Sequence, residues 1–481
     1  MPHHHPTGPS RRDWLRWAGG AAGLAALGSL GGLALPRSAQ AADYKALVCI
    51  FLYGGNDGFN MLVPTDATRH TQYLAARGPL GLPKASLLPL SGSDFGLHPA
   101  MAALRPLWSS KHLAPVINVG PLAAPLTKDQ YLAAPDDSPL IPDNLFSHSD
   151  QQRAWESAST DALARTGWGA RTAETLALNY PVISLGGNSR FGTGSQAFAL
   201  ALPGPGGVFA ANGLTPPDLA WVANQKRKAA VDALYAPGQA STLAEVYATM
   251  QRDAFTMSDR LAALVASQPG DPSVPAAIDN AFADLIEGRQ LTTGLAAQLY
   301  QIAKLIAGRD QVQGDRHVYF AGIGGFDTHA GQVDKSDNTQ GLHAGLLAEV
   351  AGAMAAFGNA MDKLGLGKQV TAFTQSDFGR TFAPNNSLGA DHAWGNVQLV
   401  SGAAVRGGAT YGAYPTPVLG GPDDVGVQAW ELQGRWIPTS SVDQFAATLL
   451  TWFGATAAQV DAVLPGLAAF GNQRSLGFML A

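Results

Sequence analysis

The sequence predicts an α/β fold, in which helices cover both faces of a mostly parallel central sheet. Three observations predict it. Short apolar runs, typical of strands buried on both faces, recur along the chain. Stretches with helical periodicity separate these runs, and such alternation is typical of α/β proteins. Acids, histidines and turn residues follow several of the runs directly. In open α/β sheets, ligands bind outside the carboxyl ends of the strands.

The predicted strands are short and rich in Val, Ile, Leu and Phe. The first is followed at once by the turn Gly54-Gly55-Asn56-Asp57-Gly58, which places two polar side chains at a strand end. The six apolar runs span residues 47–53, 114–119, 182–185, 317–322, 370–374 and 397–400.

Helical periodicity is clearest from Leu342 to Leu364, where apolar residues recur at i, i+4 and i+7 before Gly365. Helical stretches at 241–266 and 275–307 predict a helical insertion at about 215–308. Residues 186–214 carry many Gly and Pro and predict a loop. The apolar stretch 442–453 predicts a helix that docks on the sheet.

The N-terminal segment has the three parts of a twin-arginine signal peptide. Arg11 and Arg12 precede an uncharged Gly/Ala-rich run, and Ala39-Gln40-Ala41 resembles a peptidase site. We therefore expect residues 1–41 to be the signal, the twin-arginine translocase to be a partner during export, and the mature protein to be periplasmic or secreted. Residues 42–481 are expected to form one domain. The alternative is a retained anchor, but no later stretch approaches the roughly 18 apolar residues of a membrane span.

Composition excludes several classes of function. The chain has 31 Lys and Arg against 36 Asp and Glu, a net charge of −5, and no basic patch, so nucleic-acid binding is not expected. Cys49 is the single cysteine and lies within the first apolar run. This excludes an internal disulfide and argues against thiol, zinc–cysteine and iron–sulfur chemistry.

Two candidate segments lie in the first third of the chain. Asp57 follows the first strand and could ligate a metal, or it could cap the next helix in an Asx turn. Further on, Ser147, His148 and Ser149 stand at the expected start of a helix. Ser149 with Gln152 fits a capping box, while a serine at a helix N-terminus could also attack a phosphate or sulfate ester.

Two more segments follow later strands. Asp327 and His329 offer an oxygen and an imidazole within one turn, which suits Zn²⁺ or Mn²⁺. Asp377 ends a strand, Arg380 could hold an oxyanion bidentately, and His392 is a further candidate ligand. A shared site at one edge of the sheet is therefore expected.

These motifs resemble those of the twin-arginine-exported family catalogued as domain of unknown function 1501, in the alkaline phosphatase–sulfatase superfamily. The similarity rests on motifs spread along the mature chain, namely Gly54-Gly55-x-Asp57-Gly58-x-Asn60, Ser147-His148-x-Asp150-x-Gln152, Gly325-Phe326-Asp327-Thr328-His329-x-x-Gln332 and Ser376-Asp377-Phe378-Gly379-Arg380-Thr381 through Asp391-His392. It implies an alkaline phosphatase-like fold with metal ligands at the strand ends.

The resemblance also implies roles for the candidate residues. The metal ligands would be Asp57, Asp327, His329, Asp377 and His392. A hydroxyl of Ser147 or Ser149 would be the nucleophile, and the metal would be Zn, Mn, Ca or Mg. His148 would act as general acid or base. Asp377 is followed by Phe378, where alkaline phosphatases place a histidine, and the sulfatase signature is absent.

Two functions follow as hypotheses. The first is an exported metal-dependent hydrolase of a phosphate, phosphonate or sulfate ester, on a small-molecule or polymer substrate. The second is a non-hydrolytic exported protein on the same fold, which binds or helps to assemble a surface polymer or a protein partner. The missing histidine after Asp377 favours the second hypothesis, and the retained Asp and His residues favour the first.

Overall fold

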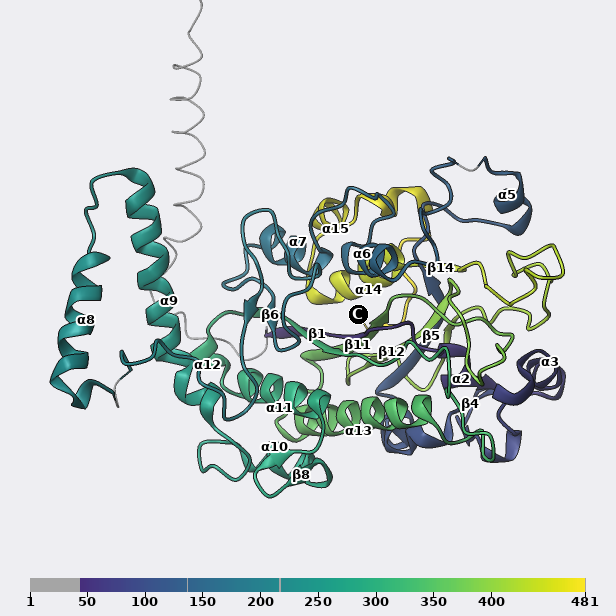
Figure 1. Ribbon diagram of the computed structural model, residues 1–481, viewed down its shortest axis with the longest axis horizontal. Helices are drawn as coiled ribbons and strands as arrows, with labels where there is room; N and C mark the ends of the chain where they lie inside the picture. The colour runs from purple at the N-terminus through teal and green to yellow at the C-terminus, as the bar shows by residue number, and fades with distance from the viewer. Residues whose placement is uncertain (1–43, 136, 216–217, 481) are drawn as a thin grey trace, which may run out of the picture. The chain divides into compact units, whose positions relative to one another are not determined.

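The computed structural model describes residues 44–135, 137–215 and 218–480 (Figure 1). The predicted signal peptide, residues 1–41, lies outside the described residues. The elements and contacts of the fold belong to these three described ranges.

A mixed sheet of nine strands forms the centre of the fold (Figure 1). Its order is β13-β5-β12-β11-β1-β10-β6-β7, with β14 beside β5. Only β12 pairs antiparallel to its neighbours β11 and β5, so the sheet is mostly parallel. The strands are β1 (Lys45–Leu52), β5 (Leu113–Gly120), β6 (Ile183–Ser184), β7 (Leu200–Ala201), β10 (Arg316–Ile323), β11 (Val370–Ser376), β12 (Asn396–Ser401), β13 (Tyr411–Gly412) and β14 (Ser440–Ser441).

Alternate side chains of β1 point into two separate hydrophobic cores, as the two-residue period of a strand requires. Val48, Ile50 and Leu52 pack in the core that includes α10 (Ala276–Ala281), α11 (Gly294–Ala307) and α13 (Leu342–Lys363). Leu47, Cys49 and Phe51 pack in the core of the opposite face, with α6 (His148–Ser157), α7 (Trp168–Thr175), α14 (Val442–Phe453) and α15 (Ala457–Val463). The predicted α/β fold class is therefore confirmed.

Shorter elements surround these layers. A three-stranded sheet has the order β2-β4-β3, and β8 pairs with β9. Their bounds are β2 (Leu62–Pro64), β3 (Leu88–Pro89), β4 (Phe95–Leu97), β8 (Ile286–Glu287) and β9 (Gln290–Leu291). The remaining α-helices are α2 (Gly58–Met61), α3 (Ala67–Arg77), α4 (Arg105–Ser109), α5 (Lys128–Ala133), α8 (Val222–Leu234), α9 (Thr242–Ala266) and α12 (Arg309–Val312). The 3₁₀ helices are η1 (Gly78–Leu80), η2 (Lys84–Ser86), η3 (Pro99–Leu104), η4 (Asp218–Ala220), η5 (Ala283–Leu285) and η6 (Pro465–Phe470).

The C-terminal helix α14 shows how local sequence sets an element. Ser441 and Gln444 form a capping box at its start, and Gly454, with φ of 105°, ends it in a left-handed conformation. Nearly all of its residues are buried. The helix predicted at 442–453 is thus confirmed, as are the six strands.

The region predicted as a helical insertion has helices in both predicted stretches. Within 275–307, the hairpin β8–β9 separates α10 from α11. Helix α11 belongs to the core: ten of its residues are buried, and it packs on β10 and α13. The predicted loop 186–214 also contributes a short strand, β7.

Among the described helices, α13 alone has the length and apolar composition of a membrane span. Its side chains pack against η3, α10 and α11, and 56% of its most apolar window is buried in the protein. Helix α13 is therefore a layer of the core.

Candidate metal centre

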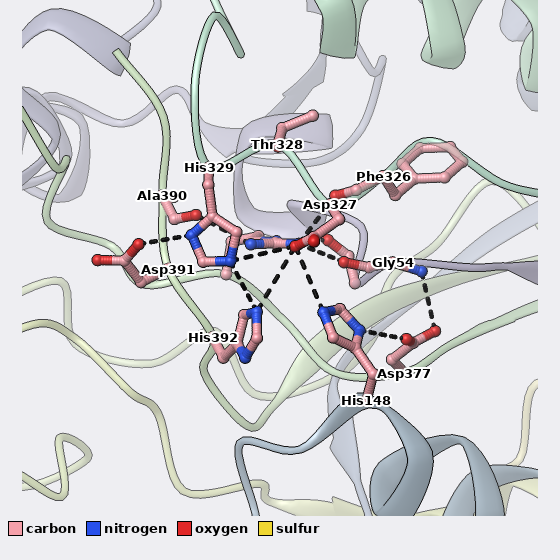
Figure 2. A network of polar contacts seen from close by, with 12 residues as sticks. Gly54, His148, Phe326, Asp327, Thr328, His329, Asp377, Ala390, Asp391 and His392 are labelled. Atoms are coloured by element: carbon pink, nitrogen blue, oxygen red, sulfur yellow. Dashed lines mark hydrogen bonds and ion pairs between the residues drawn. The ribbon is translucent and has the colours of Figure 1, made fainter. Parts of the chain in front are cut away.

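The carboxyl ends of three neighbouring parallel strands bring the candidate segments together. Leu52 at the end of β1 pairs with Ile323 of β10 on one side and with Ser376 of β11 on the other. The segments that follow these strands contain Gly54, Asp327 and Asp377, and Figure 2 shows all three within one polar network. Helix α6 adds His148 from outside the sheet, at its first residue.

Three imidazoles surround one carboxylate oxygen in this network (Figure 2). The distance to Asp327 Oδ1 is 3.4 Å from His148 Nε2, 3.2 Å from His329 Nε2 and 3.5 Å from His392 Nε2. The two atoms His329 Nε2 and His392 Nε2 are 2.8 Å apart. His148, Asp327 and His392 each offer one ligand atom within 4.8 Å of the other two, and His329 Nε2 lies beside Asp327 and His392.

The other nitrogen of each ring, Nδ1, contacts an oxygen that accepts a hydrogen bond and cannot donate one. Two of these oxygens belong to ionised carboxylates, and the third is a backbone carbonyl oxygen. The three Nδ1 contacts, all of 2.7 Å, are His148 to Asp377 Oδ2, His329 to Asp391 Oδ1 and His392 to the carbonyl oxygen of Phe146. Each Nδ1 must then donate, which leaves the lone pair of the neutral ring on Nε2. All three lone pairs are thus directed to the same volume, as in histidines that ligate metals.

The described residues fit a divalent metal. Several lone pairs in contact with one another are unfavourable unless a proton or a cation lies between them. A tetrahedral zinc ion with ligands at about 2.0–2.1 Å separates its ligand atoms by about 3.3 Å. The three distances of 3.2–3.5 Å to Asp327 Oδ1 match that separation. The 2.8 Å between His329 Nε2 and His392 Nε2 is shorter, so one of these two rings must shift before both can ligate the same ion. Nitrogen and oxygen donors of this kind suit Zn²⁺ or Mn²⁺, and the Asp327 side chain is 50% exposed, so solvent reaches the centre.

Burial and neighbouring charges shift the pKa values of the candidate ligands in different directions. The Asp377 hydrogen bond raises the pKa of His148, while burial lowers the pKa of His392. Burial works against ionisation of Asp327, but the hydrogen bond and charge of Arg380 outweigh it and lower the pKa of that carboxyl. His392 is therefore neutral and Asp327 ionised near neutral pH, whereas a metal must displace a more tightly held proton from His148.

Phe378 forms one wall of the centre. Its buried ring lies 4.8 Å from the His148 ring and 4.5 Å from the His392 ring, between centroids. Phe378 is the position at which the sequence departs from the alkaline phosphatase pattern. A Cβ at Gly55, whose φ is +84°, would come within 2.4 Å of the Phe378 ring, so only glycine fits at that position. The aromatic ring restricts how the two imidazoles can turn.

The hydrogen bonds of Arg380 do not agree with its predicted role in binding an oxyanion. Its side chain is fully buried, and every nitrogen of the guanidinium donates to the protein. The acceptors are the carbonyl oxygens of Gly54, Gly55, Phe326 and Ala390 together with Asp327 Oδ1. The group therefore ties the segment after β1 to the segment after β10, and it holds Asp327 in place. It has no N–H directed to solvent in this arrangement.

Asp57 does not join the three imidazoles, contrary to the prediction. It is fully buried, forms an ion pair with Arg77 and accepts a hydrogen bond of 2.6 Å from Gln332 Nε2. It also caps α2 by accepting from the Asn60 backbone N–H, which is the Asx-turn alternative. Thr328 donates to Gln332 at 3.0 Å, so Asp57 supports the loop that carries Asp327 and His329.

Asp377 contacts the candidate ligand His148 and does not contact Asp327. Its Oδ2 accepts from His148 Nδ1 and, at 2.8 Å, from Gln152 Nε2, while its Oδ1 accepts from the Gly54 N–H at 3.1 Å. Its three hydrogen bonds replace the predicted metal contact. Asp377 therefore orients His148, the residue predicted as a general acid or base.

The two candidate nucleophiles lie at the start of α6. Ser147 is the N-cap residue without a side-chain capping bond, so the predicted capping box of Ser149 and Gln152 is wrong. The hydroxyls of Ser147 and Ser149 lie 3.2 Å from each other. Among the described residues, neither hydroxyl has a hydrogen bond to the four candidate ligands. The geometry thus leaves the nucleophile predicted from the sequence unassigned.

Residues 44–425 match the model of a family described as a protein of unknown function, DUF1501. The chain belongs to the DUF1501 family. A search of curated proteins found no match.

Solved structures resemble this DUF1501 protein only distantly. Ps i-CgsB in complex with k-i-k-neocarrahexaose is 11% identical, with 86% of this chain and 74% of that chain covered and a TM-score of 0.33. The PsFucS1 sulfatase from Pseudoalteromonas sp. is 9% identical, with 98% and 76% covered and a TM-score of 0.33. A putative sulfatase from Bacteroides thetaiotaomicron VPI-5482 is 10% identical, with 88% and 75% covered and a TM-score of 0.28.

Sequence reasoning missed three features of the centre in this family member. It gave no role to Asp391, although this acid directly precedes the candidate ligand His392. It assigned Gln152 to a cap and His148 to proton transfer. The spacing of His148, Gln152 and Glu156 at i, i+4 and i+8 was the available signal, because it places all three on one face of α6. Glu156 accepts from Tyr53, directly after β1, so that face lies against the strand ends.

Proposed function

We propose that this protein is an exported metal-dependent hydrolase of a phosphate, phosphonate or sulfate ester. The observation that carries the proposal is the convergence of three imidazole Nε2 atoms on Asp327 Oδ1, with each Nδ1 already held by an oxygen. The class of ester comes from the motif resemblance. The twin-arginine pattern at residues 1–41 supports export to the periplasm or beyond.

A divalent metal bound by these residues would polarise an ester oxygen and lower the pKa of water. His148, His329 and His392 would hold it through Nε2. Asp327 would act through Oδ1, and its Oδ2 has no hydrogen-bond partner among the described residues. Because Asp327 is half exposed, Oδ2 can accept a hydrogen bond from an incoming water molecule and so position it. Arg380 keeps this carboxylate oriented and ionised.

Water as the nucleophile agrees better with the site than a serine. The hydroxyls of Ser147 and Ser149 bond each other and lie outside the hydrogen-bond network of the candidate ligands described above. The same observation favours the second candidate function, a non-hydrolytic exported protein that binds or helps to assemble a surface polymer or a protein partner. Turnover separates the two functions.

The test combines metal analysis with activity. Protein exported natively should contain about one equivalent of a divalent metal and should hydrolyse an aryl phosphate, phosphonate or sulfate. Asp327→Ala should remove turnover and weaken metal binding. Asp334→Ala is the matched control, because Asp334 is an exposed acid in the same loop, and it should leave both unchanged. Bound metal without turnover on any of these esters would favour the binding function, and absence of metal would refute the proposed centre.

Export has its own test. Replacement of Arg11 and Arg12 by Lys should leave the precursor folded in the cytoplasm, because the paired arginines are an address that a receptor reads. Cell fractionation measures the outcome. Normal export of the double variant would show that another signal directs the chain.

A further inference from the structure

Arg435 is a second arginine beside the candidate metal centre, and it is held differently from Arg380. Its backbone N–H donates to Asp424 Oδ1 at 3.1 Å, and its carbonyl accepts from the Val425 N–H at 3.2 Å. Asp424 is fully buried and also accepts from the N–H groups of Gly420, Gly426 and Gly434. The base of the Arg435 side chain is therefore attached to a well-bonded loop.

The guanidinium of Arg435 is fixed as well. Its Nε donates to the carbonyl oxygen of His392 at 3.0 Å, and its central carbon lies 4.2 Å from the centroid of the Phe146 ring. The backbone carbonyl oxygen of Phe146 in turn accepts a hydrogen bond from His392 Nδ1. A cation over an aromatic face is attracted to it, so two contacts align the guanidinium beside one candidate ligand. The backbone carbonyl of His392 therefore contacts Arg435, while the imidazole ring of His392 faces the metal centre.

The outer edge of this guanidinium has no partner. Within the described residues, Arg435 Nη1 and Nη2 form no hydrogen bond or ion pair, whereas both Nη atoms of Arg380 donate to protein oxygens. Arg435 is partly buried, and burial lowers its pKa although the charges of Asp391, Asp424 and Glu431 oppose this. Asp391, the strongest of these charges, accepts from His329 and Asn385 through Oδ1 and makes no direct contact with the guanidinium among the described residues.

We propose that Arg435 binds the anionic group of the substrate, with Nη1 and Nη2 donating to two oxygens of a tetrahedral oxyanion beside the metal centre. The planar edge of a guanidinium matches such a pair of oxygens, whereas a lysine offers a single point charge. This inference rests on the proposed function and names the residue that recognises its substrate class. It moves the predicted oxyanion-binding role from Arg380 to Arg435.

Isothermal titration of the mature, metal-loaded protein with inorganic phosphate, and separately with inorganic sulfate, tests the inference. Arg435→Gln should weaken binding of the anion that wild type prefers by about 10- to 100-fold, the usual effect of losing hydrogen bonds to a charged group. Arg435→Lys should recover part of that loss because the charge remains. Arg165→Gln, which replaces an exposed arginine, is the matched control and should bind as wild type does.

The metal content of each variant keeps this test separate from the proposed function. The inference requires Arg435→Gln to retain the metal and lose anion affinity. Equal anion affinity in Arg435→Gln and wild type would overturn it. Loss of metal with unchanged anion affinity would also overturn it, because Arg435 would then only support His392. A wild type that binds metal but neither anion overturns the inference alone, whereas a wild type without metal refutes the proposed function.

Discussion

Asp57→Asn distinguishes a buried ion pair from a metal ligand, the role that the sequence predicted for Asp57. The carboxylate is fully buried, and the charge of Arg77, also fully buried, lowers the pKa of Asp57 although burial opposes ionisation. If Asp57 serves the fold, its replacement should lower stability with and without metal. If it ligates a metal, its replacement should abolish metal binding and leave the stability of the metal-free protein nearly unchanged.

The expected magnitude follows from the partners that Asp57 would leave behind. Loss of one member of a buried pair costs about 3–5 kcal/mol, because the other charge remains buried without compensation. Gln332 Nε2 also loses its acceptor, which adds about 1 kcal/mol. Asparagine keeps an oxygen for Arg77 and for the Asn60 N–H, so we expect Asp57→Asn to lose about 3 kcal/mol. The complete removal in Asp57→Ala is expected to lose more.

Urea unfolding of the mature protein, with and without zinc, is the assay. At a free zinc concentration of 100 times the Kd, binding should stabilise the native state by about 2.7 kcal/mol. Asp57→Asn should keep this increment and Asp327→Asn should lose it. The double variant Asp57→Asn/Arg77→Met should lose less stability than the sum of its single variants, because no charge is left alone. A stable Asp57→Asn protein without the zinc increment would refute the reasoning.

Three further predictions concern buried titratable groups. Asp377→Asn places an amide donor against His148 Nδ1, so the metal affinity in a chelator competition should fall about 10- to 100-fold; an unchanged affinity would show that Asp377 does not orient the ring. Burial raises the pKa of Asp443 to about 7, so its contribution to stability is complete below about pH 4 and is lost as the pH rises through 7. The stability of Asp443→Asn relative to wild type should therefore increase by about 4 kcal/mol between pH 4 and pH 8, and a constant difference would contradict this. Burial lowers the pKa values of His98 and His343 to about 3 and about 4, so their contribution is complete above pH 6.5 and is lost as the pH falls. At pH 5 each should cost about 2 kcal/mol. The stability of His98→Gln or His343→Gln relative to wild type should therefore increase by about that amount between pH 7 and pH 5, and a constant difference would exclude it.

The sequence was sufficient to predict the sheet and the edge where polar residues gather. Buried strands are apolar on both faces, so their positions are visible in one dimension, and Asp327, His329 and His392 directly follow or flank such runs. The partner of each acid was not visible in the same way. Asp57 pairs with Arg77 across 20 residues, and Asp377 accepts from His148 across 229 residues. Distances along the chain do not show which of several acids a distant cation or imidazole will reach.

The roles of Arg380 and Arg435 could not be predicted for the same reason, because the sequence does not show which groups lie next to each guanidinium. Arg380 lies in a motif next to Asp377, which favoured a catalytic role, yet it is buried among carbonyl oxygens that no side-chain pattern reveals. Arg435 lies in a loop without a recognisable motif. Its position became visible only when the structure placed it on the carbonyl of His392.

The Arg380 clamp has a consequence for the order of folding. Its guanidinium donates to carbonyl oxygens up to 326 residues away in sequence. Contacts across such separations form late, because the intervening chain must first lose much of its freedom. Asp327 is oriented by this clamp, and His148 lies on α6, which contacts strand β11 of the sheet. A metal ion therefore has no assembled set of ligands to meet until the chain is nearly native. We expect metal to enter a folded protein, and refolding rates in a stopped-flow experiment to be the same with zinc and with a chelator.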